Sequence, residues 1–340
     1  MNHLKLTLAA ISVALTLCLG GCGHDTSPTT QAGSDKKLKI AVIPKGTTSE
    51  YWKIVHAGAV KAQQELGAGN TEIIWKGSLK EDQSAEQISV VEDMFNNRVD
   101  AIVLAPNDAS ALAPIVDTAA KKNIPVVIID SGVKTDSYKS MVSTDNKKGG
   151  HMGGVELAKE LGGKGKVIML RYQEGSASTE EREEGFLDAM KEAGVTVVDA
   201  SKHGGVTADQ CQKAAENLLA AYTKDGALTI DGIFCPNQTS TFGMLRALQD
   251  AKFAGKVKFV GFDADAALAQ AVRDKQIGAL VVQNPLNMGY LGVKTAVDLA
   301  EGKTVPHAID SGVNLVTTEN VDTPESKEIL APDVGKYLKD

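Results

Sequence analysis

The sequence predicts an α/β fold made of two doubly wound parallel-sheet lobes. Short apolar runs alternate with helical stretches from Lys37 onward. Runs such as Leu38–Ile43 are apolar throughout, as strands of a parallel sheet covered on both faces require. The alternation starts again near His151, and two successive βα series on one chain favour two lobes rather than one.

The first series opens with a strand and a helix that Ser49 can cap. A later helix ends near Lys121 and Lys122, whose charges suit a helix C-terminus. The apolar runs predict strands at Leu38–Ile43, Glu72–Trp75, Ala101–Leu104 and Val126–Ile129, and the periodicity predicts a helix over Gln83–Phe95.

The second series repeats this pattern and runs to about residue 316. Its predicted helices are His151–Leu161, Glu180–Ala193, Gln210–Tyr222, Thr241–Ala251, Ala266–Arg273 and Met288–Ala300. Its predicted strands are Lys166–Leu170, Val195–Val198, Ile230–Phe234, Val257–Gly261, Ala279–Gln283 and Val313–Val316.

The N-terminus has the pattern of an exported protein. Leu6–Leu19 is uncharged and Leu-rich, but shorter than the roughly 20 apolar residues of a membrane span. It ends in Leu19-Gly20-Gly21-Cys22, which resembles a bacterial lipobox with Cys22 as the lipidated residue. We therefore expect a lipoprotein signal peptide over 1–22 and a flexible polar tether over 23–37. An ordinary cleaved signal, with Cys22 incidental, is the alternative.

Composition and motifs argue against several function classes. The 36 Lys and Arg against 43 Asp and Glu give a net charge of −7, so we expect no nucleic-acid partner. No phosphate-binding Gly loop, G-x-S-x-G elbow or paired His spacing for a metal occurs. Asp130 and Asp263 could be imagined as the two catalytic carboxylates of a glycosidase, but no third group points to a nucleophile or a water. We expect a non-enzymatic protein without a cofactor or metal.

Ligands of doubly wound sheets bind at the carboxyl ends of the strands. The residues there include carboxylates, an Arg, amides and two neighbouring aromatics. Such groups suit a sugar, which needs fixed donors and acceptors for its hydroxyls and flat apolar faces for its ring C–H groups. Arg182 offers a rigid fork that can serve two adjacent hydroxyls.

Several stretches together resemble the ribose-binding protein group of periplasmic sugar receptors. They are Ile40-Ala41-Val42, Asp130, Ser143-Thr144-Asp145-Asn146, Glu181-Arg182-Glu183-Glu184-Gly185-Phe186, Leu245-Arg246-Ala247-Leu248 and Val260-Gly261-Phe262-Asp263. The resemblance covers Leu38 to about Val316. Carried over by position, it implies ligand contacts at Lys45, Ser49, Tyr51, Trp52, Asp130, Ser131, Arg182, Asn237, Asp263 and Gln283.

The resemblance also implies an architecture and a role. We expect an N-terminal lobe of 38–144 plus 284–312, a C-terminal lobe of 145–283 plus 313–318, and a tail of 319–340. Hinge crossings are expected near Thr144–Asp145, Gln283–Asn284 and Gly312–Val313. The implied protein is a monomeric receptor, held at the membrane by its lipid in the periplasm or at the cell surface. It would deliver a monosaccharide to the permease of an ABC transporter.

Two departures from the family pattern bear on the ligand. Lys45 stands where a small hydroxyl residue is usual, and Ser131 follows Asp130 where ribose binders carry Arg. Counting Lys45 and Arg182 against Asp130 and Asp263, the contacts carry no net charge. We therefore expect a neutral sugar other than ribose, with a sugar acid facing Lys45 as the alternative.

Other readings stay open at this stage. A sensory protein that presents sugar to a receptor kinase or chemoreceptor is the alternative function. A transcription factor is disfavoured, since a signal and no helix-turn-helix precedes the first strand.

Each proposed contact also has a structural alternative. The two aromatics could pack on the sheet, the two Asp could cap turns, Arg182 could pair with Glu180 or Glu184, and Lys45 could sit in a solvated turn. Asn237 and Gln283 could be turn amides.

Cys211 and Cys235 fall at one edge of the predicted second sheet. A disulfide and two buried free thiols are equally compatible with the sequence.

Overall fold

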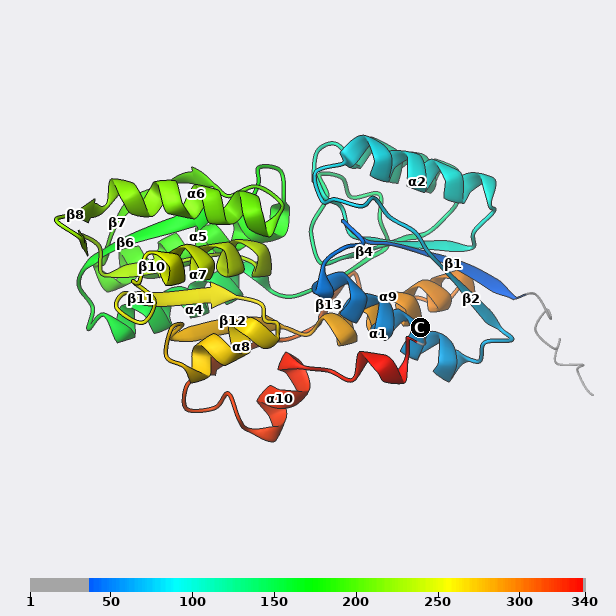
Figure 1. Ribbon diagram of the computed structural model, residues 1–340. Coiled ribbons are helices and arrows are strands. Elements are labelled where there is room, and N and C mark those ends of the chain that lie inside the picture. The colour runs from blue at the N-terminus through cyan, green and yellow to red at the C-terminus, as the bar shows by residue number, and fades with distance from the viewer. Residues whose placement is uncertain (1–36, 339–340) are drawn as a thin grey trace, which may run out of the picture. The chain divides into compact units, whose positions relative to one another are not determined.

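The computed structural model describes residues 37–338, so the predicted signal peptide, Cys22 and nearly all of the tether lie outside the described residues. Two six-stranded sheets, each covered by helices, make up the described chain (Figure 1). The predicted α/β class with parallel sheets is therefore confirmed. Among the described residues, no helix combines the length and apolarity needed to cross a membrane.

The first sheet has the order β13-β5-β4-β3-β1-β2, and all of its pairings are parallel. Its strands are β1 (Leu38–Ile43), β2 (Thr71–Trp75), β3 (Ala101–Leu104), β4 (Val126–Ile129), β5 (Ser140–Ser143) and β13 (Ala308–Asp310). Figure 1 shows α2 (Ser84–Asn96) on one side of it, and α1 (Glu50–Leu66) and α9 (Pro285–Ala300) on the other. The helix α3 (Ala113–Lys121) shares the apolar core of α2.

The second sheet has the order β14-β12-β11-β10-β6-β7. Its strands are β6 (Lys166–Arg171), β7 (Thr196–His203), β10 (Gly232–Phe234), β11 (Lys258–Phe262), β12 (Ala279–Gln283) and β14 (Val313–Thr317). One face packs on α4 (Asn146–Glu160) and α5 (Ala177–Ala193). The other packs on α6 (Ala208–Ala221), α7 (Gln238–Asp250) and α8 (Ala266–Arg273). Because both faces are buried, the central strands are apolar throughout.

Hydrophobic periodicity does not reveal the shortest strands. The strands β5 and β13 have four and three residues and carry polar side chains, so no apolar run marks them. The strand β14 runs antiparallel to β12, which an apolar run alone does not reveal. The predicted tail contains α10 (Pro324–Leu330) and the short η1 (Val334–Lys336), and a small hairpin pairs β8 (Thr223–Lys224) with β9 (Ala227–Leu228).

The chain passes between the two sheets after β5, after β12 and after β13. The first and third of these segments lie side by side. The Thr144 hydroxyl donates to the carbonyl of Gly312 at 3.1 Å, and the amide of Ser311 donates to the carbonyl of Ser143 at 3.0 Å. The side-chain amide of Asn287, in α9, donates to the backbone carbonyl of Ser311 at 3.3 Å. Gly312 has φ of 94°, a conformation that favours glycine.

Both cysteines of the described chain are free and buried, so of the two alternatives it is the free thiols that the structure contains. Burial raises the pKa of Cys211 to about 12. Neither thiol therefore carries the thiolate character that reactive cysteines need.

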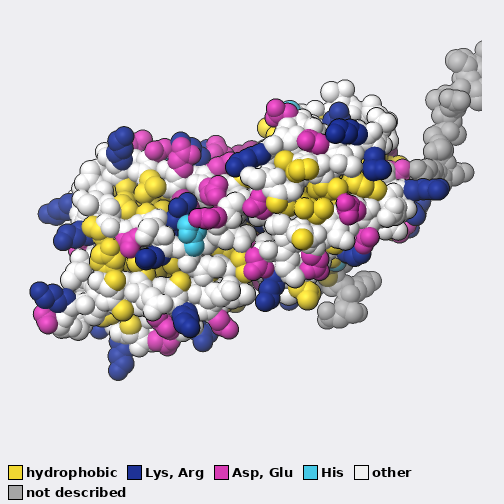
Figure 2. Space-filling view, turned by 90° about the horizontal axis from the view of Figure 1, so that it is seen from above, with side chains coloured by type: hydrophobic (Ala, Val, Ile, Leu, Met, Phe, Trp, Pro, Cys, Tyr) yellow, Lys and Arg dark blue, Asp and Glu magenta, His cyan; other side chains and the backbone are white. Residues whose placement is uncertain are grey.

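The surface carries charges of both signs. In Figure 2, Lys and Arg side chains alternate with Asp and Glu across the visible face, with no extended area of one sign. This distribution agrees with the modest net charge of −7.

Candidate functional site

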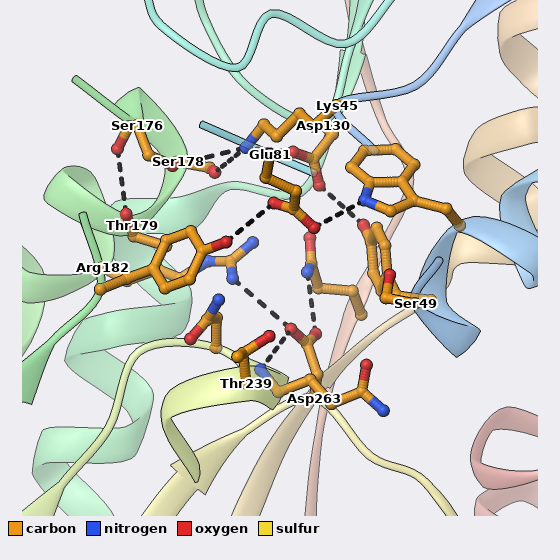
Figure 3. A pocket seen from close by; sticks show the side chains of 16 residues that line it. Lys45, Ser49, Glu81, Asp130, Ser176, Ser178, Thr179, Arg182, Thr239 and Asp263 are labelled. Atoms are coloured by element: carbon orange, nitrogen blue, oxygen red, sulfur yellow. Dashed lines mark hydrogen bonds and ion pairs between the residues drawn. The ribbon is translucent and has the colours of Figure 1, made fainter. Parts of the chain in front are cut away.

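A polar cavity lies between the carboxyl ends of the two sheets and holds about 380 Å³ of free space, its mouth included (Figure 3). Both sheets contribute, because Asp130 follows β4 of the first sheet while Asp263 follows β11 of the second. The lining also includes the helix starts that carry Ser49 and Asn237.

The predicted contacts converge on this cavity with one exception. Its walls include Lys45, Ser49, Tyr51, Trp52, Asp130, Arg182, Asn237, Asp263 and Gln283. Ser131 is fully buried behind the wall, where its hydroxyl accepts the backbone N–H of Ser178 at 3.0 Å. Lining the cavity does not by itself show ligand contact, so contact by these nine residues stays a prediction. The hydroxyl of Ser131 instead bonds to the protein backbone.

Sequence reasoning missed seven lining residues, which are Glu81, Tyr172, Ser176, Ser178, Thr179, Gln238 and Thr239. Tyr172 directly follows β6, so the strand-end rule could have found it. Glu81 lies in the loop between β2 and α2, well beyond the strand end, and no spacing marks it.

Lys45 and Asp130 form a buried ion pair with 2.8 Å between Nζ and Oδ2. The Tyr51 hydroxyl donates to the other oxygen of Asp130, also at 2.8 Å. Burial by itself would raise the pKa of Asp130, but the charges of Lys45 and Arg182 and these hydrogen bonds outweigh it and lower the pKa. Asp130 is thus held ionised, with lone pairs still available to a ligand.

Lys45 is 3% exposed, which rules out a solvated turn. Besides Asp130, its ammonium group donates to Ser178 at 3.1 Å and to Ser176 at 3.4 Å. An ammonium group has three N–H bonds, so all three are engaged with protein atoms.

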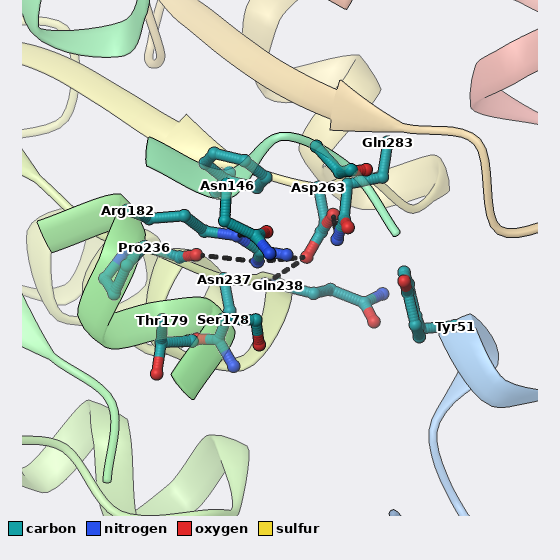
Figure 4. A network of polar contacts seen from close by, with 12 residues as sticks. Tyr51, Asn146, Ser178, Thr179, Arg182, Pro236, Asn237, Gln238, Asp263 and Gln283 are labelled. Atoms are coloured by element: carbon teal, nitrogen blue, oxygen red, sulfur yellow. Dashed lines mark hydrogen bonds and ion pairs between the residues drawn. The ribbon is translucent and has the colours of Figure 1, made fainter. Parts of the chain in front are cut away.

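Arg182 lies at the centre of a second network (Figure 4). Its Nε donates to Asn146 at 2.9 Å, and its Nη1 donates to the carbonyl of Pro236 at 3.0 Å and lies 3.7 Å from Asp263. The guanidinium group stacks over the Phe262 ring at 4.0 Å. Arg182 is 2% exposed, so it is not a surface partner of Glu180 or Glu184.

Asp263 accepts from Gln283 Nε2 at 2.8 Å and from the backbone N–H of Gln238 at 3.3 Å. Burial raises the pKa of Asp263, and the charge of Arg182 only partly offsets it. The adjacent helix α8 is capped by Asp265, whose side chain accepts the N–H of Leu268, so capping is not what Asp263 does there.

Three polar atoms in this region are buried and have no partner among the described residues. They are Ser49 Oγ, Arg182 Nη2 and Gln283 Oε1. Buried polar groups are nearly always hydrogen-bonded, so three orphans around one cavity indicate a polar ligand. Ser49 holds the N-cap position of α1 but makes no capping hydrogen bond, which corrects the expected cap.

Asn237 has two roles. Its side-chain Oδ1 caps α7 by accepting from the backbone N–H of Ser240 at 3.1 Å. Its side chain also lines the cavity, and no hydrogen bond of its amide nitrogen is among those described. The structure therefore shows the helix cap, and ligand contact by the amide nitrogen stays a prediction.

Tyr51 and Trp52 both line the cavity, with ring centroids 5.0 Å apart and planes at 88°. Trp52 is 2% exposed and also belongs to the apolar core under α1. Its indole N–H donates to Glu81 at 2.8 Å. In the described chain, no group of three or more His, Cys, Asp or Glu is arranged to hold a metal ion.

Residues 40–304 match the sequence pattern of a family described as the periplasmic binding protein domain. The chain belongs to the periplasmic binding protein family. The resemblance stated from the sequence is thereby confirmed.

Two curated members illustrate the relationship. The D-ribose/D-allose-binding protein of Pseudomonas aeruginosa is 29% identical over 84% of this chain and 91% of its own length. The D-allose-binding periplasmic protein of Escherichia coli is 30% identical over 79% of this chain and 86% of its own length.

Solved structures of the family have the same fold. A carbohydrate transporter solute-binding protein from Agrobacterium radiobacter, in complex with D-arabinose, is 34% identical with a TM-score of 0.81. The match covers 87% of this chain and 100% of that one. An ABC transporter solute-binding protein from Agrobacterium vitis with bound D-fucose is 35% identical with a TM-score of 0.80, covering 86% and 99%. These family members are sugar-binding transport proteins.

Proposed function

We propose that the protein is an extracytoplasmic receptor that closes around a small neutral monosaccharide and delivers it to an ABC-type sugar importer. The observation that carries this proposal is the set of three orphaned polar atoms, Ser49 Oγ, Arg182 Nη2 and Gln283 Oε1, around one cavity. A donor from Arg and an acceptor from Gln match hydroxyl groups, each of which both donates and accepts.

The remaining chemistry of the wall fits the same ligand. The carboxylates of Asp130 and Asp263 offer acceptors on opposite sides, one from each sheet. Tyr51 and Trp52 offer aromatic surface for sugar C–H groups. We assign ligand contact to the nine predicted residues that line the cavity and withdraw it from Ser131.

Closure requires two bodies and a hinge. We propose lobes of 38–144 plus 284–312 and of 145–283 plus 313–318, and the strands of the two sheets divide at the same places. The adjoining segments at Thr144 and Gly312, together with Gln283–Asn284, would absorb the rotation. A closed form excludes water and presents the permease with a surface that differs from the open form.

Transport is favoured over sensing, because the curated relatives include proteins named as ribose import binding proteins. We infer no catalysis, because the family members named above are sugar-binding transport proteins.

We propose that Cys22 carries a lipid that anchors a monomeric receptor to the membrane. A Cys22→Ser variant of the full-length chain is expected to move from the membrane fraction to the soluble fraction on cell fractionation. Equal membrane partitioning of variant and wild type contradicts the anchor.

Calorimetric titration tests the function. The probes are D-ribose, D-allose, D-arabinose, D-fucose, D-galactose and D-glucose. We expect at least one of these neutral sugars to bind with a dissociation constant of about 1 μM or lower, given the enclosed polar site. A folded protein that binds none of them contradicts the proposal.

A further inference from the structure

Glu81 is the one carboxyl group of the cavity wall that sequence reasoning missed. It comes from the loop after β2 and reaches the cavity beside Lys45 (Figure 3). One of its oxygens accepts the indole N–H of Trp52 at 2.8 Å, and the other accepts the Tyr172 hydroxyl at 3.1 Å. The side-chain amide of Gln173 also donates to the Glu81 backbone carbonyl at 3.4 Å.

These contacts connect the two sheets. Trp52 belongs to α1 on the first sheet, whereas Tyr172 and Gln173 follow β6 of the second. Trp52 and Tyr172 are 2% and 1% exposed, so the side chain that joins them is held at both oxygens by buried groups. The Glu81 carboxyl group therefore has a fixed place on the wall.

Glu81 changes the charge of the cavity. With Asp130 and Asp263 it makes three acidic groups against two basic ones, Lys45 and Arg182. Each basic group already lies beside an Asp, whereas the two side-chain donors to Glu81 are uncharged. Burial raises the pKa of Glu81 and the charge of Lys45 opposes that rise.

Lys45 does not compensate for this excess. Its ammonium group donates its three N–H bonds to Asp130, Ser176 and Ser178, so none is free to bind a ligand carboxylate. A sugar acid placed near Lys45 would meet Glu81 and Asp130 instead. Like charges brought together in a desolvated site are strongly unfavourable.

We propose that Glu81 is the specificity-determining residue that excludes sugar acids, so that the cavity accepts uncharged sugars only. This inference rests on the proposed function and assigns its selectivity to one side chain. The same carboxyl group accepts hydrogen bonds from Trp52 and Tyr172, which lie on opposite walls of the cavity.

The test compares matched ligands that differ at C6. D-galactose is titrated against D-galacturonate, and D-glucose against D-glucuronate, by calorimetry at about pH 8, where a free carboxyl group is ionised. In each series the pentose that lacks C6, L-arabinose or D-xylose, serves as a further neutral probe. The proteins are wild type, Glu81→Gln and the control Glu86→Gln, whose carboxyl group is exposed on α2.

Wild type and Glu86→Gln are expected to bind a neutral sugar and to show at least a tenfold preference for it over the matching acid. Glu81→Gln keeps an acceptor for Trp52 but loses the charge, and we expect it to reduce that preference about tenfold or more.

Other results overturn the inference. An unchanged acid-to-neutral ratio in Glu81→Gln, or a wild type that binds an acid as tightly as its neutral partner, shows that Glu81 does not select. If wild type binds no neutral sugar in this series or in the wider panel, the proposed function fails, and the inference fails with it. A loss of folding in Glu81→Gln is recognised by its circular dichroism, and Glu81→Met then supplies the uncharged side chain.

Discussion

Asp130 and Asp263 occupy equivalent places at the ends of β4 and β11, and both have positive φ angles of 65° and 62°. This conformation is costly for most side chains, but Asp and Asn tolerate it. The strained turn points each carboxylate into the cavity, where it meets partners from distant parts of the chain. Asn is therefore the substitution that removes the charge and keeps the backbone.

Asp130→Asn is expected to destabilise the ligand-free protein. Because the pKa of Asp130 is lowered on folding, its contribution is fully present above the unfolded value of 3.8 and is lost as the pH falls through the folded value. Breaking a buried ion pair costs about 3 kcal/mol, so urea denaturation near neutral pH should show a loss of about that size.

The same comparison at about pH 3 should show a smaller loss, because below 3.8 the unfolded wild-type chain takes up a proton at this carboxyl group while the folded ion pair resists protonation. An equal loss at both pH values means that the charge of Asp130 does not carry the effect.

The residue scale also shows what sequence can predict. Strand ends could be located from apolar runs, and the strand-end rule then selected Asp130, Asp263 and Gln283 correctly as cavity residues. Ser131 does not line the cavity, because its buried hydroxyl accepts the backbone N–H of Ser178, a long-range contact that no local pattern in the sequence reveals. Glu81 could not be found, because its position depends on the path of a loop rather than on any periodic pattern.

At the scale of elements, close helix crossings place the site. Gly58 of α1 and Gly289 of α9 meet so tightly that a Cβ at Gly58 would lie 2.0 Å from the carbonyl oxygen of Leu286. In the second sheet's layer, a Cβ at Gly150 of α4 would lie 1.9 Å from the carbonyl oxygen of Arg182. The first crossing fixes the helix whose first turn carries Tyr51 and Trp52, and the second fixes the helix that carries Arg182.

Gly58→Ala is expected to destabilise the protein by about 1–3 kcal/mol, because the contact is with backbone that cannot move aside. It should also weaken sugar binding, since α1 must shift. Gly69→Ala is the matched control, because no atom lies within 4 Å of the added Cβ. Thermal unfolding and calorimetry of both variants give the comparison, and equal behaviour of the two contradicts the role of the crossing.

The short elements were the hardest to predict. The strand β13 joins the edge of the first sheet through only three residues, and its register is set by pairing with β5 rather than by its own composition. Several helix starts of the second series lie earlier than predicted, as with α4, which begins at Asn146 because Asp145 caps it. Caps of this kind leave only a single polar residue in the sequence.

At the scale of the whole chain, the two covered sheets share one cavity, and the polar groups on its walls come from both. Lys45 reaches Ser176 and Ser178 across it, and Glu81 reaches Tyr172. These direct contacts hold the two walls together, while Ser49, Arg182 and Gln283 keep unpaired atoms for a ligand. The two βα series predicted the two sheets. Only the folded chain shows which polar groups bond to one another across the cavity and which keep unpaired atoms.

Calorimetric titration of wild type beside Asp263→Asn tests the central claim most directly. The neutral sugars of the panel are the ligands, and Asp274→Asn, an exposed position at the end of α8, is the control. A charged hydrogen bond contributes about 1.5–3 kcal/mol, so we predict that Asp263→Asn weakens binding by about 10- to 100-fold while the control binds as wild type does. Wild-type affinity in Asp263→Asn, or no sugar binding by the folded wild type, would contradict a sugar receptor built around this cavity.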